Sequence, residues 1–278
     1  MLKSVRTEEL HALAEAFWPL TQDLTRSTYP TYTDGIKTRH DFVHQLCRAA
    51  DGDWGDVLLH LRSGQINGLL LIDQVDEQHV SLQVCLTRAC QHECLRETLA
   101  YISGKHPGKT LWIGFAPENR ELLDFVTQQG FELQDSSINW TLHLATWPEQ
   151  EVPTCVHRVT EENYGQFRSL WTDQEMYWTA ERIREHLDRW RLFVYQDGEC
   201  LCGAVACMDE GLMLEIFGFQ YAAGYDQAVH QALMTACLCD AKGRAQHLTY
   251  FSSEEEAPVM KALGFQRVSD YLCYEKRL

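Results

Sequence analysis

Cysteine and histidine are the residue types in this sequence that could bind a metal ion, so their spacing is considered first. The chain has 11 cysteines and 12 histidines. Cys90/Cys94 and Cys237/Cys239 are close in sequence, but neither pair has a second pair at the spacing of a zinc site. No two histidines have metal-ligand spacing on a convincing helical pattern. We therefore expect no metal site.

Several of the cysteines occur instead in the sequence environment of core residues. Five of them interrupt apolar stretches, as small buried side chains do: Cys85, Cys200, Cys202, Cys207 and Cys273. The odd total also argues against a framework of paired disulfides. We therefore expect free thiols and a reducing environment.

The charge and the apolar runs of the chain exclude several classes of partner. The formal net charge is −16, so the surface field repels phosphodiester backbones and anionic lipid headgroups. The longest apolar runs, such as 68–72, are too short to cross a bilayer, and the first residues lack the apolar segment of a signal peptide. We expect a cytoplasmic protein with no nucleic-acid or membrane partner, and the oligomeric state stays open.

Two glycine landmarks recur in both halves of the sequence. Gly64 lies in a turn between apolar runs, and Gly130 follows a helical pattern and precedes a phenylalanine; they are 66 positions apart. Gly198 and Gly264 have the same surroundings and the same separation of 66 positions. An offset of 134 also places apolar residues on apolar residues along most of both halves. The sequence therefore predicts two repeats of one domain.

The beginnings of the two repeats align with a larger offset. Trp18 matches Trp171 at an offset of 153, so the first repeat has 19 additional residues after Trp18. We assign them to the polar stretch 25–35, which has the composition of a loop. Residues 147–153 contain two prolines and two acids and are the natural linker. The predicted domains are residues 1–147 and 153–278.

Both repeats have the same predicted order of elements. A short strand and two helices are followed by three strands of a meander, at 57–62, 66–73 and 79–86 in one repeat and at 191–196, 200–208 and 212–219 in the other. A helix, a strand at 110–115 or 246–251, a further helix and a final pair of strands complete each repeat. A meander followed by a strand–helix–strand unit predicts an α/β fold of the α+β type with a mixed sheet.

This order, together with two local motifs, resembles the GNAT acetyltransferase superfamily twice over, along nearly the whole chain. Residues 118–131 are similar to the family's asparagine-led helix, which here starts at Asn119 and ends in Gly130-Phe131. The turn at Gly64 is similar to the family's hairpin between its second and third strands. The resemblance implies two tandem GNAT-like acyl-CoA N-acyltransferase domains with acetyl-CoA as co-substrate.

The resemblance also implies where acetyl-CoA would bind. The family places the pantetheine where the fourth strand separates from the fifth, and the pyrophosphate on amides at the N-terminus of the next helix. In the second repeat the implied contacts are Phe217, Phe219, Tyr221, Ala223, Gly224, Tyr225 and Asp226. In the first repeat they are Val84, Leu86, Arg88, His92 and Asn119.

The glycine-rich phosphate signature of the family is degenerate in both repeats. The second repeat keeps Gly224 but has Asp226, whose charge would lie beside the pyrophosphate. The first repeat has no glycine between Thr87 and His92, where Arg88 and His92 offer positive charge instead.

For catalysis, the resemblance implies that Glu215 removes a proton from the acceptor amine, directly or through water. Its counterpart in the first repeat is Ser81, so the second repeat is the expected working half. The family's proton-donating tyrosine corresponds to Val126 and Met260, neither of which can donate a proton. Water or another hydroxyl, such as that of Tyr250 or Tyr271, is the alternative donor.

Each assignment has a structural alternative. Glu215 can pair with an arginine on a strand edge, and Asp226 and Asn119 can be helix caps or turn residues. Four aromatic residues of the second repeat could line an acceptor site or simply pack in the core: Trp171, Tyr177, Trp178 and Trp190.

Two functions follow from these alternatives. The first is an acetyl-CoA-dependent N-acetyltransferase that acts on an amine of a small molecule or peptide. The second is a catalytically inactive tandem GNAT that binds CoA or another small ligand, or has a structural role. The acidic surface favours a cationic acceptor on electrostatic grounds.

Overall fold

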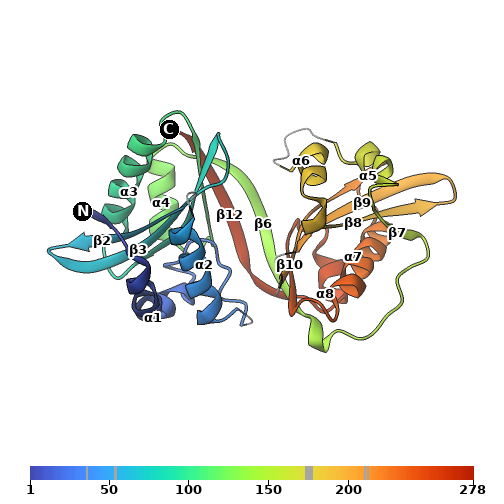
Figure 1. Cartoon of the computed structure of the whole chain (residues 1–278), viewed down its shortest axis with the longest axis horizontal. Coiled ribbons are helices and arrows are strands. Elements are labelled where there is room, and N and C mark those ends of the chain that lie inside the picture. Colours follow the sequence, from blue (N-terminus) through green and yellow to red (C-terminus); the bar gives the residue numbers. More distant parts are fainter. Residues whose placement is uncertain (36, 53–54, 173–177, 210, 212) are drawn as a thin grey trace. The chain divides into compact units, whose positions relative to one another are not determined.

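The computed structural model describes residues 1–35, 37–52, 55–172, 178–209, 211 and 213–278, which form two compact units (Figure 1). The N-terminal unit consists of Met1–Ser137 and Val268–Leu278, and the C-terminal unit of Ile138–Arg267. Tyr177, and Leu212 at the start of the predicted strand 212–219, lie outside the described residues.

The N-terminal unit is a mixed sheet covered by helices. Its strands follow one another across the sheet in the order β1 (Leu2–Ser4), β2 (Gly55–Arg62), β3 (Gln65–Gln74), β4 (His79–Thr87), β5 (Thr110–Phe115) and β12 (Gln266–Arg277). The pair β4–β5 is parallel, and the other pairs described in this unit are antiparallel. The helices are α1 (Leu10–Thr21), α2 (Arg39–Asp51), α3 (Gln91–Lys105) and α4 (Arg120–Gln128).

The apolar run in β3 explains why both faces of this sheet are covered. Leu69 and Leu71 pack in a core with Phe17 of α1, whereas Leu70 and Ile72 pack in a second core with α3 and α4. Successive side chains of a strand point to opposite faces, so a continuous apolar run needs helices on both.

The C-terminal unit repeats this plan. Its strands lie in the order β6 (Glu132–His143), β11 (His247–Ser252), β10 (Met213–Tyr221), β9 (Cys200–Asp209), β8 (Trp190–Asp197) and β7 (Val156–Arg158). The helices are α5 (Tyr164–Leu170), α6 (Ala180–Glu185), α7 (Gln227–Ala241) and α8 (Ala257–Ala262). One core lies against α7 and α8, and the other against α5 and α6. The predicted mixed-sheet fold class is therefore confirmed.

The four landmark glycines occupy the turns that the sequence predicted. Gly64, Gly130, Gly198 and Gly264 all have positive φ, between 59° and 88°. In this region the missing Cβ removes the steric cost that other residues would have. Among the cysteines expected in the core, Cys85 and Cys207 are buried, but Cys200 is exposed at the start of β9, where its hairpin meets solvent.

The last strand of each repeat completes the sheet of the other unit. β6, from the first repeat, pairs antiparallel with β11, from His143 opposite His247 to Ile138 opposite Ser252. β12, from the second repeat, pairs antiparallel with β5 from Leu272 onward. The domains predicted as 1–147 and 153–278 follow the repeats of the sequence, whereas the folded units exchange their final strands.

The sequence predicted a final pair of strands in each repeat. For the described residues this prediction is wrong. A single strand of 12 residues is present instead, β6 in one repeat and β12 in the other. Each of these strands is twice as long as the six-residue strand beside it, β11 for β6 and β5 for β12. Part of each long strand lies in one unit and the rest in the other. No helix in the described part of the chain is long and apolar enough to cross a membrane.

Residues 268–278 belong to the second repeat in the sequence but to the N-terminal unit in the structure. Deleting them should destabilise the N-terminal unit. β5 would lose its antiparallel partner, whereas β11 would keep β6. We expect amide hydrogen exchange at 110–115 to accelerate by about tenfold or more, because unpaired edge amides open locally. Exchange at 247–252 is the internal control, and equal protection at 110–115 before and after deletion would contradict the strand exchange.

Candidate functional site

In the C-terminal unit, β10 separates from β11 partway along its length. Their parallel ladder runs from Met213 opposite His247 to Ile216 opposite Tyr250 and ends there. The ladder between β10 and β9 continues to Tyr221, with an irregularity at Phe217. A bulge of this kind bends a strand away from its neighbour. Beyond Ile216, β10 therefore has a described strand on one side, β9.

Glu215 lies just before this separation. It is half-buried and stands opposite Met208 of β9 and Thr249 of β11. Met208 in turn lies opposite Trp190 of β8, so Glu215 and Trp190 belong to one row across the same face of the sheet. This face is the one covered by α5 and α6.

Aromatic rings surround the bulge on that face. The rings of Trp178, Trp190 and Phe217 contact one another edge to face, with centroids 5.1–6.0 Å apart. Trp171 is buried, stacks on Phe167 and donates from Nε1 to the carbonyl of Trp178. Trp171 and Trp190 are core residues, while Trp178 and Phe217 are half-buried beside the row that holds Glu215.

The other side of the gap is lined by a polar and aromatic cluster. The ring of Phe219 lies 4.2 Å from His230 and 5.4 Å from Tyr250, centroid to centroid. The Tyr221 hydroxyl is 2.6 Å from His230 Nδ1, and Tyr250 donates to Glu256 Oε1 at 2.7 Å. Burial lowers the pKa of His230 to about 4, against the attraction of Glu256, so this imidazole is neutral at pH 7.

The junction between β10 and α7 is exposed, as an anion-binding loop would be. Ala223 and Gly224 are solvent-exposed, and Gly224 has φ of +88°. Asp226 is the N-cap of α7, and its Oδ1 accepts from the amides of Ala228 at 2.8 Å and Val229 at 3.1 Å. The capping role considered for Asp226 is therefore present, and it puts a negative charge at the positive end of the helix.

The N-terminal unit has the same strand separation. β4 pairs in parallel with β5 from His79 to Ser81, and the ladder ends there. The register of β4 with β3 shifts between Leu82 and Val84, so Gln83 is the bulged residue. Ser81 thus stands before the separation, as Glu215 does in the other unit.

Here, however, a segment of the chain itself occupies the gap. Thr28 Oγ1 donates to the carbonyl of Gln83 and accepts from the amide of Cys85, both at 2.9 Å. Thr28 also forms an antiparallel bridge with Phe115 of β5, and the Tyr29 amide donates to the Gly114 carbonyl at 2.8 Å. The segment belongs to the insertion that the sequence located at 25–35.

Side chains around the gap fix this segment. Tyr29 contacts the Ser81 hydroxyl at 3.0 Å and packs against Tyr271 of β12. Burial raises the pKa of both phenols. A Cβ on Gly114 would overlap the Tyr271 hydroxyl, so only glycine fits at that position. Tyr271 is therefore a packing residue of this unit and does not face an open gap.

The cofactor contacts predicted for the first repeat have other roles in this arrangement. Asn119 is fully buried, caps α4 through the Leu122 amide and donates to the Ser27 carbonyl, both at 3.2 Å. Val84 and Leu86 are buried in the core below α1 and α2. The filled gap argues against pantetheine binding at these residues.

The phosphate end of the N-terminal unit is nevertheless hollow and partly basic. A cavity of about 470 Å³ adjoins the β4–α3 junction and is lined by Arg26, Arg88 and Arg120, together with Glu118 and Glu121. Cys90 precedes α3 at φ of +55°, a conformation usually taken by glycine. His92 lies in the first turn of α3, and its ring packs on Phe125 of α4. This contact holds the His92 ring beside the β4–α3 junction.

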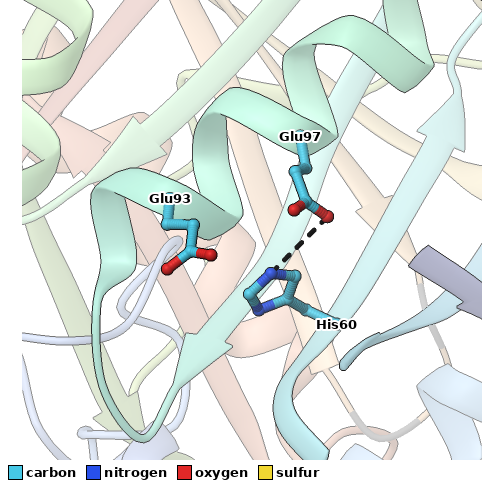
Figure 2. A group of neighbouring side chains, drawn as sticks. All are labelled: His60, Glu93 and Glu97. Carbon is cyan, nitrogen blue, oxygen red and sulfur yellow. Dashed lines mark ion pairs between the residues drawn. The ribbon is translucent and has the colours of Figure 1, made fainter. Parts of the chain in front are cut away.

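One group of side chains in this unit has the composition of a metal site. His60 of β2 faces Glu93 and Glu97 of α3, and their ligand atoms lie within 4.8 Å of one another (Figure 2). His60 is buried, and its Nε2 is 3.6 Å from Glu97 Oε2. Arg62 lies 3.2 Å from Glu93 and neutralises that carboxylate.

The tautomer of His60 decides against a metal. Asn67 accepts from the Ala89 amide at 3.1 Å and donates to the Ala89 carbonyl at 2.8 Å, which fixes the orientation of its amide. Its NH₂ group therefore faces His60 Nδ1 at 3.1 Å, and Nδ1 must accept. A histidine bound through Nε2 would instead donate from Nδ1. The ion pair between Arg62 and Glu93 ties β2 to α3, and His60 is a buried neutral residue beside it.

Comparisons with known proteins agree with this architecture. No protein-family model matches the sequence, and no curated protein matches it. The structure is similar over its whole length to a GCN5-related N-acetyltransferase from Sphaerobacter thermophilus, with a TM-score of 0.67, 12% identity and 95% of that chain covered. It is also similar to a tandem GNAT protein from the clavulanic acid biosynthesis pathway, with a TM-score of 0.62, 13% identity and 100% and 98% of the two chains covered.

These similarities establish that the chain has the tandem GNAT fold. The sequence resemblance to this superfamily is confirmed at the level of the fold. The first of these two neighbours is an acetyltransferase by name.

The stability of the protein should depend on pH through His230. Its folded pKa lies below the ordinary value of 6.5, so an unfolded chain binds a proton that the folded chain does not. The contribution of His230 to stability is therefore complete above about pH 6.5 and is lost as the pH falls toward 4. His230→Gln should flatten this part of the curve in denaturant unfolding, while exposed His157→Gln should keep it; identical curves for both variants would contradict the assignment.

Proposed function

We propose that this protein is an acetyl-CoA-dependent N-acetyltransferase that acts on an amine of a small molecule or peptide, with the C-terminal unit as the working half. One observation carries the proposal. β10 leaves β11 after Ile216, directly beyond Glu215, whereas the matching gap in the N-terminal unit contains Thr28.

The C-terminal unit would offer different backbone groups to the two ends of a CoA molecule. The edge of β10 from Phe217 to Tyr221 would offer backbone groups to the pantetheine arm, because its described ladder with β11 ends at Ile216. The exposed loop around Gly224 would offer amides to the pyrophosphate. When bound, acetyl-CoA would supply the acyl group as a thioester.

Glu215 is the residue that we assign to the acceptor. As a carboxylate it would accept a proton from the amine, directly or through a water molecule, and so leave a lone pair for attack on the thioester. Its negative charge and the neighbouring half-buried rings of Phe217 and Trp178 favour a cationic acceptor. The acidic net charge of the chain acts in the same direction.

The departing thiolate needs a proton from another group. Met260 holds the position of the family's tyrosine and is fully buried. Tyr250 lies opposite Ile216, where the strands separate, and is the candidate donor in this unit. Burial and the neighbouring Glu256 raise its pKa, so the hydroxyl keeps its proton at neutral pH.

A specific observation also favours the second function, a non-catalytic binding or structural protein. The Asp226 carboxylate already bonds two amides at the N-terminus of α7. Burial raises the pKa of Tyr221, and the charges of Glu256 and Glu255 raise it further, so both carboxylates act on the same junction. A pyrophosphate would meet repulsion there, whereas an uncharged or cationic ligand would not.

Calorimetric titration with acetyl-CoA and a thiol-release assay over a panel of amines separate the two functions. We expect the wild-type chain to bind acetyl-CoA, and Glu215→Gln to keep that binding while kcat falls by about 100-fold or more, because proton removal contributes about that factor. Ser81→Ala is the matched control in the other unit and should leave kcat unchanged. No binding at millimolar acetyl-CoA would remove the transferase proposal.

Replacing Asp226 with asparagine should strengthen acetyl-CoA binding. Asparagine keeps an oxygen for the amides of Ala228 and Val229 but removes the charge beside the pyrophosphate. We expect Kd to fall by a factor of about 2–5, the effect of one charge at a helix terminus. Asp188→Asn, at an exposed position away from this junction, is the control. An unchanged Kd in Asp226→Asn would indicate that phosphates do not bind at α7.

A further inference from the structure

We propose that residues 26–29 are a built-in occupant of the strand gap in the N-terminal unit, which replaces a bound pantetheine arm and keeps this unit closed to CoA. The first support is the regular pattern of contacts along β4. Gln83, Cys85 and Thr87 alternate along the strand, and each has a backbone group bonded by the segment. Alternate residues present their backbone groups to the same edge, so the segment satisfies that edge as a neighbouring strand would.

The bonds along this edge come from side chains rather than from a backbone ladder. Thr28 Oγ1 serves both Gln83 and Cys85, and the Arg26 guanidinium donates to the carbonyls of Thr87 at 3.3 Å and Arg88 at 3.1 Å. A hydroxyl acts as donor and acceptor at once, which lets one residue replace two backbone partners.

The second support is that both walls of the gap and both adjoining helices hold the segment. Tyr29 bonds the Gly114 carbonyl of β5, Asn119 at the start of α4 bonds the Ser27 carbonyl, and Gln91 at the start of α3 donates to the Arg26 carbonyl at 3.3 Å. Ser27 and Thr28 are 2% and 4% exposed. A ligand entering the gap would leave these buried groups without partners, which costs about 1–3 kcal/mol for each group.

The third support is that the closure is local to the gap. The cavity of about 470 Å³ beside the β4–α3 junction lies next to the segment and carries Arg88 and Arg120. Those two arginines are outside the segment and suit a phosphate. Removing the segment would therefore open the edge of β4 beside a cavity that keeps two arginines, together with Glu118 and Glu121.

The first test is Thr28→Val in the full-length chain, with Thr25→Val as the matched control. Valine keeps the shape of threonine but removes the hydroxyl that bonds Gln83 and Cys85; the Thr25 hydroxyl is exposed and bonds Asp23. We expect amide exchange at 83–87 to be about tenfold faster in Thr28→Val and unchanged in Thr25→Val. Equal exchange in the two variants overturns the proposal.

The second test replaces residues 24–35 by a shorter glycine–serine linker and titrates the chain with CoA. We expect one more CoA site per chain than in wild type, with new protection from exchange at 83–91. A folded variant with the wild-type number of sites overturns the proposal. Because wild type is the reference, this outcome differs from failure of the proposed function, in which wild type itself binds nothing. If the shortened chain does not fold, the Thr28→Val result decides.

Discussion

The separation of one strand from its parallel neighbour is the constraint on which the rest of this structure depends. β4 leaves β5 after Ser81, and β10 leaves β11 after Ile216, each beside an irregularity in the strand. Such a separation exposes a row of backbone amides and carbonyls that need hydrogen-bond partners. Whatever supplies those partners determines what the unit can do. Thr28 and Arg26 supply them in the N-terminal unit, and in the C-terminal unit we assign them to a ligand.

The two units therefore have complementary deficits. The N-terminal unit has Arg88 and Arg120 at its phosphate end, beside two glutamates, but its strand gap is filled. The C-terminal unit has a strand edge beyond Ile216 and a carboxylate at Glu215, but an acid caps the helix where phosphates would bind. The strand separation favours the C-terminal unit for catalysis. The negative charge of the Asp226 cap opposes phosphate binding, so removing this charge should increase the affinity for a phosphorylated cofactor.

The exchange of final strands gives a physical reason why the chain keeps an N-terminal unit whose strand gap is filled. β6 is made by the first repeat but pairs with β11, and Trp140 of β6 is buried and donates to Ser252 Oγ at 2.8 Å. β12 is made by the second repeat and completes the N-terminal sheet beside β5. The loss of either repeat would leave the other sheet with an uncovered edge, so the two halves depend on each other for stability.

Several of these features could be predicted from the sequence because their causes are local. The strand 110–115 follows from its apolar run, and the turns at Gly64 and Gly198 follow from glycine's access to positive φ. The capping role of Asp226 follows from its place before a helical pattern. Each of these signals lies within a few residues of the element that it specifies.

Other features depend on contacts between residues far apart in the chain. Residues 25–35 have the composition of a loop, and nothing local in Thr28 indicates that its hydroxyl bonds Gln83 and Cys85, more than 50 positions away. The same is true of β6 and β12, because alternating apolar residues predict a strand but not the sheet that it joins. The His60 cluster likewise depends on Asn67 and Ala89, which no spacing rule connects.

The most direct measurement of the central claim is the footprint of acetyl-CoA on the wild-type chain by amide hydrogen exchange. If the C-terminal gap is the cofactor site and the N-terminal gap is closed, saturating acetyl-CoA will slow exchange at 217–227 and leave exchange at 83–91 unchanged. Protection at 83–91, or at neither segment, would contradict this account.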